Sequence, residues 1–157
     1  MEKFPITVKG YAKLVEEIKH LKTVERPTIV QAIASARELG DLSENAEYHS
    51  AREKQSFVEG KIIELEDKMA RAEIIDITKI SGNTIKFGAT VLLTDNDTDK
   101  QVSYKLVGDY EADLAQGMVS ISSPIAKALI GKAEGDSVDV TTPKAIRSYD
   151  IEKVEFK

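Results

Sequence analysis

Mostly apolar residues in the first half of the chain recur at alternating steps of three and four, and this period constrains the fold more than any other feature. A heptad repeat of this kind places its apolar positions along one side of an α-helix, where a partner helix can cover them. The repeat consists of Tyr48, Ala51, Gln55, Val58, Ile62, Leu65, Met69 and Ala72. It predicts one long helix, about 36 Å from end to end at a rise of ~1.5 Å per residue.

A second helical pattern precedes this one and is interrupted by a proline. Its apolar residues at helical spacing are Tyr11, Leu14, Ile18, Leu21, Ile29, Ile33 and Ala36. Thr7 can cap the start of this helix, and Gly40 is typical of a helix end. Pro27 lacks an N–H, so a kink or a restarted helix with Pro27 in its first turn is expected. Two such helices joined by a short turn predict an antiparallel coiled-coil hairpin that forms a protruding arm.

The period changes near Asp76 from helical to alternating. Strands are predicted for residues 85–94, 101–108, 118–122, 137–142 and 149–156, with a polar turn at residues 95–99 and a short helix at residues 124–131. The fold class is therefore α+β. We expect an N-terminal coiled-coil domain at residues 1–76 and a C-terminal domain at residues 77–157, which forms a small, mostly antiparallel sheet with one helix packed on it.

Composition limits the function classes. The 157-residue chain has 41% hydrophobic and 31% charged residues and a formal net charge of -5, which argues against broad, nonspecific binding to nucleic acid. It contains no cysteine, so disulfides and thiolate metal sites are excluded. No apolar run approaches the roughly 18 residues that span a bilayer, and the N-terminal residues lack the apolar core of a signal peptide. We therefore expect no membrane association and a cytoplasmic location.

Two carboxylates, Asp41 and Glu44, lie where the hairpin should turn. An Asp followed three residues later by Glu also resembles a capping box, and helix caps are far commoner than metal sites. In the functional interpretation the same two side chains converge on one cation. Because Mg²⁺ takes about six oxygen ligands, two carboxylates alone would form an incomplete site, to which a partner, substrate or water must contribute.

Basic residues accompany these acids, notably Arg37, Arg52 and Lys54. The default interpretation is a solvated helix flank with Glu–Arg pairs. Alternatively, Arg37 and Arg52 form a small positive patch that receives a phosphate backbone.

Four segments in the same order resemble the bacterial transcript cleavage factors of the GreA type, over essentially the whole chain. They are Ala36-Arg-Glu-Leu-Gly-Asp-Leu-Ser-Glu-Asn-Ala-Glu-Tyr-His-Ser-Ala-Arg-Glu, Phe87-Gly-Ala-Thr-Val, Leu106-Val-Gly-Asp-Tyr-Glu-Ala-Asp113 and Ser122-Ser-Pro-Ile-Ala-Lys-Ala-Leu-Ile-Gly-Lys132. The resemblance implies a coiled coil followed by a C-terminal domain with an FKBP-like fold. It also implies a protein that acts on bacterial RNA polymerase at the rim of its secondary channel, without being an enzyme itself.

The same resemblance assigns roles to individual residues. Asp41 and Glu44 match the tip acids, which help hold a second Mg²⁺ in the polymerase active centre while backtracked RNA is hydrolysed; the free protein is expected to hold no cofactor. Arg37 and Arg52 match a basic patch that touches the RNA 3′ segment, and Asn45 and Tyr48 shape the tip. The polymerase-docking loop of the family matches Ser122, Ser123, Pro124 and Ile125. The protein is expected to be a monomer.

Three alternatives stay open at this stage. A homologue of these factors could occupy the same channel and inhibit the polymerase. A free-standing metal nuclease would hydrolyse RNA with Mg²⁺ alone. A plain coiled-coil adaptor would not depend on charge at the hairpin tip.

Overall fold

The computed structural model describes residues 2–157. These residues form two compact units. One unit is Tyr11–Ala72, and the other combines Glu2–Gly10 with Glu73–Lys157. The units differ from the predicted domains at residues 1–76 and 77–157, because the first strand, β1 (Phe4–Thr7), pairs with β2 (Ala72–Ile75) in a two-stranded sheet. The domain boundary itself stays a prediction.

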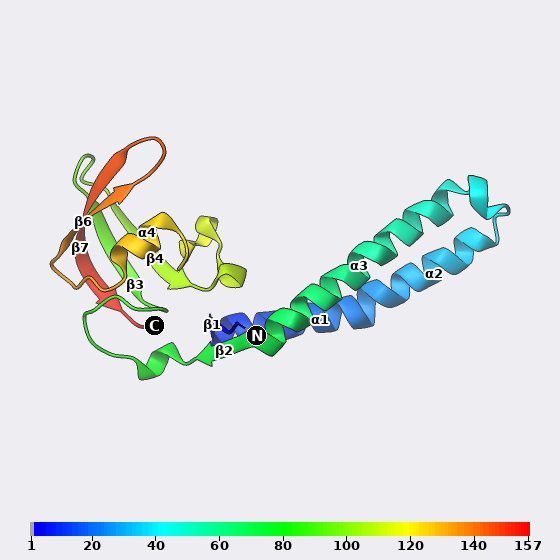
Figure 1. Ribbon diagram of the computed structural model, residues 1–157, viewed down its shortest axis with the longest axis horizontal. Coiled ribbons are helices and arrows are strands. Elements are labelled where there is room, and N and C mark those ends of the chain that lie inside the picture. Colours follow the sequence, from blue (N-terminus) through cyan, green and yellow to red (C-terminus); the bar gives the residue numbers. More distant parts are fainter. Residues whose placement is uncertain (1) are drawn as a thin grey trace. The chain divides into compact units, whose positions relative to one another are not determined.

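The first unit is a helical hairpin, in which α2 (Arg26–Arg37) runs alongside α3 (Ala46–Arg71) in the opposite direction (Figure 1). α1 (Val8–His20) leads into α2 through a π-helical turn, Leu21–Glu25. The Arg26 N–H donates to the Leu21 carbonyl, five residues back, immediately before Pro27. This confirms the expected restart with Pro27 in the first turn of a helix. Because Pro27 has no N–H to donate, the hydrogen-bond ladder is rearranged in the turn before it.

The heptad repeat follows the buried side of α3 (Ala46–Arg71), and its last position, Ala72, begins β2. All eight of its positions are at least half-buried, and Ala51, Val58, Ile62 and Leu65 are buried. Ile29 of α2 packs with Val58 and Ile62, and Leu21 and Ile33 border this cluster. The helical hairpin is thus confirmed, while the supercoiling of a true coiled coil stays a prediction.

Two ion pairs connect the helices across the hairpin. The Arg26 guanidinium donates from Nε and Nη2 to the two oxygens of Glu59, at 2.9 and 2.8 Å, and Lys22 pairs with Glu66. Exposed pairs of this kind contribute little to stability, because the solvent screens both charges. Their main effect is on register, because the bidentate geometry is satisfied at one alignment of the helices.

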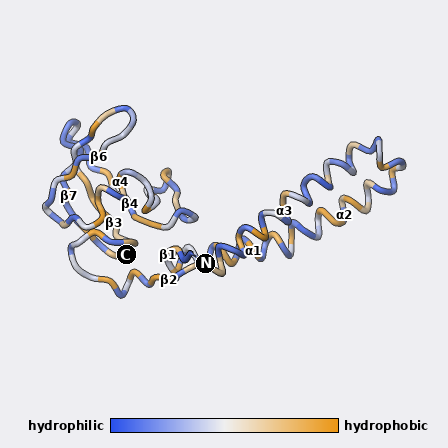
Figure 2. The backbone as a smooth tube through the Cα atoms, viewed as in Figure 1, coloured by the Kyte–Doolittle hydropathy of each residue, from blue (hydrophilic) through white to orange (hydrophobic). Residues whose placement is uncertain are grey.

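The second unit contains a five-stranded sheet in the order β5-β4-β3-β7-β6. Its strands are β3 (Thr90–Asp95), β4 (Gln101–Val107), β5 (Met118–Ser120), β6 (Ser137–Thr141) and β7 (Ile146–Glu155). Buried and half-buried residues alternate along β3, and Figure 2 shows hydrophobic residues in this strand. α4 (Pro124–Leu129) contributes Ala126 and Leu129 to the same core as Val91 and Leu93. The α+β class with one helix on a sheet is confirmed.

The sheet is mostly antiparallel, as predicted, with one parallel pair of strands at an edge. β4 and β5 are parallel, whereas β3–β4, β3–β7 and β6–β7 are antiparallel. The chain between β4 and β5 forms two 3-10 turns, Asp109–Glu111 and Leu114–Gln116, in place of a tight hairpin turn. β5 therefore enters the sheet in the direction of β4.

Two strands begin three or more residues away from their predicted starts, and β5 ends at Ser120, two residues earlier than predicted. β3 begins at Thr90 and not at Ile85, because a turn at Gly88, with φ 84°, precedes it. β7 begins at Ile146, three residues before Tyr149, because the added residues pair with β6.

Within residues 2–157, no helix is both long and apolar enough to cross a membrane.

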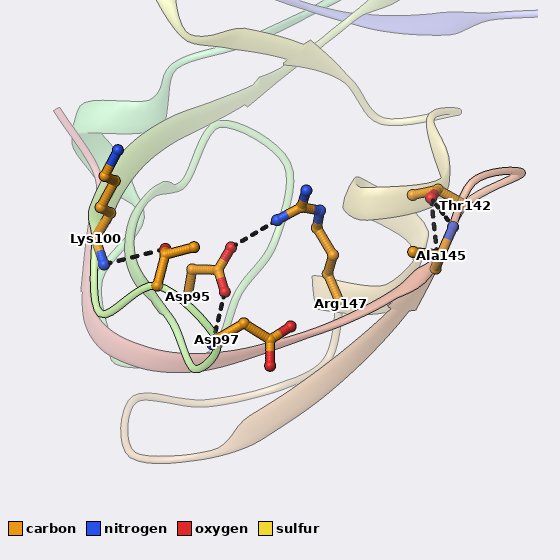
Figure 3. Close-up of polar contacts among 7 residues, drawn as sticks. Asp95, Asp97, Lys100, Thr142, Ala145 and Arg147 are labelled. Atoms are coloured by element: carbon orange, nitrogen blue, oxygen red, sulfur yellow. Dashed lines mark hydrogen bonds and ion pairs between the residues drawn. The ribbon is translucent and has the colours of Figure 1, made fainter.

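The polar turn after β3 is organised by a buried carboxylate, as Figure 3 shows. Asp95 is only 7% exposed, and its Oδ1 accepts the Asp97 N–H at 2.9 Å. Arg147 of β7 donates from Nη1 to Oδ2 at 3.0 Å. The Asp97 N–H, followed by Arg147, lowers the pKa of Asp95. The segment is therefore a hairpin turn fixed to a neighbouring strand.

We predict that the two adjacent isoleucines of α3 respond oppositely to truncation. Ile62 is 3% exposed and Ile63 is 70% exposed. Ile62→Ala should lower the free energy of unfolding by ~2–5 kcal/mol, because it leaves a cavity at the helix contact. Ile63→Ala is the matched control and should change it by less than about 0.5 kcal/mol. Urea unfolding followed by circular dichroism checks both, and equal losses would show that the wrong face of α3 has been assigned to the core.

We also predict that the contribution of Asp95 to the stability of the fold depends on pH. The folded-state pKa of Asp95 lies below its ordinary value of 3.8, so its ionised form stabilises the fold at neutral pH. This contribution is lost as the pH falls through the folded-state pKa. Asp95→Asn should therefore be less stable than the wild type at neutral pH, and urea unfolding should show the difference shrinking once the pH drops below 3.8.

The matched control for this experiment is Asp97→Asn, in the same turn. The Asp97 carboxylate is exposed and accepts no hydrogen bond from any of residues 2–157. Its replacement should leave the pH dependence of unfolding unchanged. A stability difference between wild type and Asp95→Asn that stays constant with pH would contradict the assigned role.

Candidate functional site at the hairpin tip

The tip of the hairpin is the segment between α2 and α3, residues 38–45. α2 ends at Arg37, with Glu38 as its C-cap, and Gly40 follows with φ 127°, a conformation that favours glycine. Gly40 thus lies beyond the helix end and redirects the chain. Leu42–Glu44 then form a single 3-10 turn before α3. The two candidate acids lie at the start and end of this turn.

Asp41 caps the 3-10 turn with one of its two oxygens. Its Oδ1 accepts the Ser43 N–H at 3.0 Å and the Ser43 hydroxyl at 2.9 Å. The hydrogen bond from the Ser43 N–H, followed by that from the hydroxyl, lowers the pKa of Asp41. No other hydrogen bond to Asp41 comes from residues 2–157, so Oδ2 is open to solvent or a ligand. Asp41 is therefore both a cap and an exposed, ionised carboxylate.

Glu44 does not complete a capping box. Its side chain is exposed and makes no hydrogen bond within the described part of the chain. The long helix is instead capped by Asn45, whose Oδ1 accepts the Tyr48 N–H at 3.0 Å. The cap interpretation of the acid pair thus applies to Asp41 alone and gives no structural role to Glu44.

Asn45 also connects the two helices. Its Nδ2 donates to the Ala36 carbonyl of α2 at 2.5 Å, while its Oδ1 caps α3. His49 Nε2 lies 3.3 Å from the Ser43 carbonyl, which attaches the 3-10 turn to the first turn of α3. Sequence reasoning assigned Asn45 to the shape of the tip but did not identify this contact of His49. No rule of residue spacing predicts this contact, because Ser43 lies before the start of α3 and His49 lies within the helix.

The predicted basic residues lie near this turn. Arg52 donates to the Tyr48 hydroxyl at 3.2 Å, and its guanidinium carbon lies 6.0 Å from the Tyr48 ring centre. Arg37, the last residue of α2, is exposed. Neither arginine forms an ion pair with an acid among residues 2–157, so the expected Glu–Arg pairing does not involve them. Both charges are therefore open to an anion.

Asp41 and Glu44 supply only part of the ligand set that a magnesium ion requires. Within residues 2–157, no three His, Asp or Glu side chains gather in a way that could hold a metal. Mg²⁺ takes about six oxygen ligands. The exposed carboxylates of Asp41 and Glu44 are suitable ligands of the right type, but the remaining ligands must come from elsewhere. The donor set fits a shared ion and not a site complete in this chain.

The predicted docking segment lies in the second unit, with Ser122 and Ser123 just before α4 and Pro124 and Ile125 in its first turn. Ser123 caps α4 by accepting the Ala126 N–H at 3.3 Å, and its hydroxyl donates to the Ser120 carbonyl at 2.6 Å. Ile125 packs against the core of the sheet. Ser122 and Pro124 are exposed, and the Ser122 hydroxyl donates to Asp109 at 2.8 Å. Two of the four residues are thus committed to the fold and two are open to a partner.

Two family models match the chain. The N-terminal transcription elongation factor model (GreA/GreB) matches residues 4–74, and the C-terminal GreA/GreB model matches residues 80–156.

Individual relatives agree with these matches. The chain is 65% identical over 155 residues to "Transcription elongation factor GreA" of Rickettsia prowazekii (strain Madrid E), covering 99% of this chain and 96% of that protein. It is 58% identical over 156 residues to the protein of the same name from Phenylobacterium zucineum (strain HLK1), covering 99% of each.

Among solved structures, the chain is similar to the GreA factor homolog 1 (Gfh1) protein of Thermus thermophilus. The identity is 25%, the match covers 98% of this chain and 99% of that one, and the TM-score is 0.45. It is also similar to the GreA/GreB factor of Nitrosomonas europaea, with 19% identity, coverage of 98% and 100%, and a TM-score of 0.44.

The assignment rests on the sequence matches, which cover both units and include the tip segment. The chain belongs to the GreA/GreB family of transcription elongation factors.

Proposed function

We propose that this protein inserts its hairpin tip into the secondary channel of bacterial RNA polymerase and stimulates the polymerase's own cleavage of backtracked RNA. The observation that carries the proposal is the pair of exposed carboxylates, Asp41 and Glu44, at the end of a helical hairpin in a transcription elongation factor. The protein would act in the cytoplasm as a monomer. It would rescue arrested complexes without being a nuclease itself.

Asp41 and Glu44 would hold a magnesium ion jointly with the polymerase. When bound, such an ion lowers the pKa of a coordinated water and stabilises the charge that develops on the phosphate. The contribution of this chain is to present two carboxylates in a fixed turn. Ser43 keeps Asp41 ionised and oriented through Oδ1, which leaves Oδ2 for the ion. Glu44 has no structural partner among residues 2–157 that would compete for its carboxylate.

Arg37 and Arg52 would contact the extruded RNA 3′ segment. Arg52 is oriented by Tyr48, and Arg37 is fixed at the end of α2, next to the carbonyl of Ala36 that Asn45 binds. Guanidinium groups that lack a carboxylate partner can donate to phosphate oxygens in a bidentate manner. At the other unit, exposed Ser122 and Pro124 would contact the rim of the channel, while Ser123 and Ile125 hold the loop in shape.

The first test is cleavage of backtracked RNA in purified stalled polymerase complexes. Asp41→Asn and Glu44→Gln keep the shape of each side chain but remove its charge. Each should reduce the stimulated cleavage rate by about 10²-fold, as expected when one electrostatic contact to a transition state is removed. Both variants should still compete with wild type for the polymerase, since the docking residues are unchanged.

The matched control is Glu47→Gln, an exposed acid in the first turn of α3. It should stimulate normally, because the proposal depends on two particular carboxylates and not on total charge. Normal stimulation by Asp41→Asn and Glu44→Gln would show that the two carboxylate charges are not needed for cleavage. It would favour a coiled-coil adaptor. Slower cleavage on addition of wild type would favour the inhibitor, and RNA hydrolysis without polymerase would favour a nuclease.

A separate prediction concerns the arginines. In Arg37→Ala and in Arg52→Ala, the stimulated cleavage rate should depend less on the extruded RNA 3′ segment than it does in wild type. Each should also reduce the salt dependence of the activity, because the slope of log affinity against log salt concentration changes by about 0.7 for every phosphate of a single strand that the protein no longer neutralises. Lys54→Ala, also an exposed basic residue of α3, is the control and should keep the wild-type slope. An unchanged slope in both arginine variants would contradict binding of phosphate by these side chains.

A further inference from the structure

A carboxylate from a different loop binds the start of the docking segment, residues 122–125. Asp109 lies in the 3-10 turn Asp109–Glu111, which follows β4. Its Oδ1 accepts the Ser122 hydroxyl at 2.8 Å and also the hydroxyl of Ser120, the last residue of β5. The two hydroxyl oxygens lie 2.7 Å apart. Whether or not one hydroxyl donates to the other, the hydrogen bonds end on Asp109, because an ionised carboxylate only accepts.

The parallel pairing of β4 and β5 brings Asp109 to these serines. The register of this pair places Val107 opposite Ser120. Asp109 and Ser122 each lie two residues beyond that pair, at the same end of the two strands. In an antiparallel pair, the residues that follow one strand lie beside those that precede the other. The contact between Asp109 and Ser122 therefore depends on the direction in which β5 enters the sheet.

Ser120 extends the contact from side chains to the backbone. Its Oγ accepts the Ser122 N–H at 3.1 Å. Its carbonyl accepts the Ser123 N–H at 3.0 Å and the Ser123 hydroxyl at 2.6 Å. Ser123 in turn caps α4 by accepting the Ala126 N–H at 3.3 Å. Continuous hydrogen bonds thus lead from Asp109 through residues 120–123 to the first turn of α4.

The contact of Asp109 with Ser122 restricts conformation more than it stabilises the fold. Both residues are exposed, so their contact buries little apolar surface. The core of this unit is formed by other side chains, including Ala126 and Leu129 of α4. A partner that binds a segment already held in one conformation loses less conformational entropy on binding. The loss of Asp109 should therefore affect the binding of a partner more than it affects the free energy of unfolding.

We propose that Asp109 is a positioning residue for the docking segment: by binding Ser120 and Ser122 it keeps the exposed Ser122 and Pro124 in the arrangement that a protein partner binds. The inference rests on the proposed function, in which that partner is bacterial RNA polymerase. An apparent dissociation constant rises as the binding-competent fraction of the protein falls. Removal of the Asp109 carboxylate should thus weaken docking and leave the chemistry of the tip unchanged.

The first test needs no polymerase and measures amide hydrogen exchange of the free, full chain by NMR. Asp109→Ala should speed exchange of the Ser122 N–H several-fold, because the Ser120 hydroxyl that accepts it is no longer held in place. Asp109→Asn should give an intermediate rate, because its amide oxygen still accepts hydroxyl groups. Exchange as slow in Asp109→Ala as in wild type would overturn the proposal.

The control is Asp113→Ala, in the same connection between β4 and β5. It removes a carboxylate that accepts the Gln116 side-chain amide at 2.9 Å. Exchange of the Ser122 N–H should then stay at the wild-type rate. If circular dichroism shows that Asp109→Ala does not fold, the rate in Asp109→Asn decides in the same way.

The cleavage assay separates docking from chemistry. Asp109→Ala should raise the factor concentration for half-maximal stimulation about tenfold, as expected for the loss of a hydrogen bond to a charged group. The cleavage rate at saturating factor should equal that of wild type, because Asp41 and Glu44 are unchanged. Asp113→Ala should match wild type in both quantities. A lower saturated rate without a change in the half-maximal concentration would overturn the positioning role.

A double-mutant cycle distinguishes positioning from direct contact with the polymerase. In a chain that already carries Ser120→Ala and Ser122→Ala, Asp109→Ala should not change the half-maximal concentration further, because Asp109 then has neither hydroxyl to bind. The same tenfold change in this background would show that Asp109 contacts the polymerase itself and would overturn the proposal. If wild type stimulates no cleavage, the proposed function fails, and the exchange experiment still tests whether Asp109 holds the segment.

Discussion

The packing of α2 against α3 is the interaction on which the rest of the structure depends. The hairpin has a narrow core, with Ile29, Val58 and Ile62 at its centre and charged residues outside. Two helices of this kind are held together mainly by the burial of one apolar stripe on each, since their exposed ion pairs add little. The tip has a defined shape because both helices end side by side, so that Asn45 can bind the end of one and cap the start of the other.

At the tip, the groups that stabilise the turn differ from the carboxylate oxygens that are proposed to bind the metal ion. Structural hydrogen bonds at the tip use backbone groups, Asn45, Ser43 and one oxygen of Asp41. The second oxygen of Asp41 and the whole carboxylate of Glu44 are left for an outside ligand. Two carboxylates are too few for a magnesium ion, so the proposed activity depends on ligands from the polymerase.

Sequence reasoning was most successful where the signal is local and periodic. The heptad repeat located α3 and its buried face, Pro27 located the start of α2, and the acid pair located the tip. It was weakest where the partner of a segment decides its structure. The parallel pairing of β5, the added residues of β7 and the contact between Arg147 and Asp95 all depend on which strands lie side by side. For the tip, the functional roles of Asp41 and Glu44 stay predictions, and the sequence did not indicate that only Asp41 caps the turn.

The sequence by itself determined the helical hairpin, the α+β class, the family and the candidate residues at the tip, because period, turn residues and motifs are properties of short segments. Only the tertiary structure decided that Asp41 caps a 3-10 turn, that Glu44 has no partner within residues 2–157, and that the Glu111 carboxylate accepts the N–H of Thr7, 104 positions earlier in the sequence. The physical reason is that hydrogen bonds are short and directional. Whether a carboxylate is used or left open depends on donors that the folded chain brings within about 3 Å, often from distant positions in the sequence.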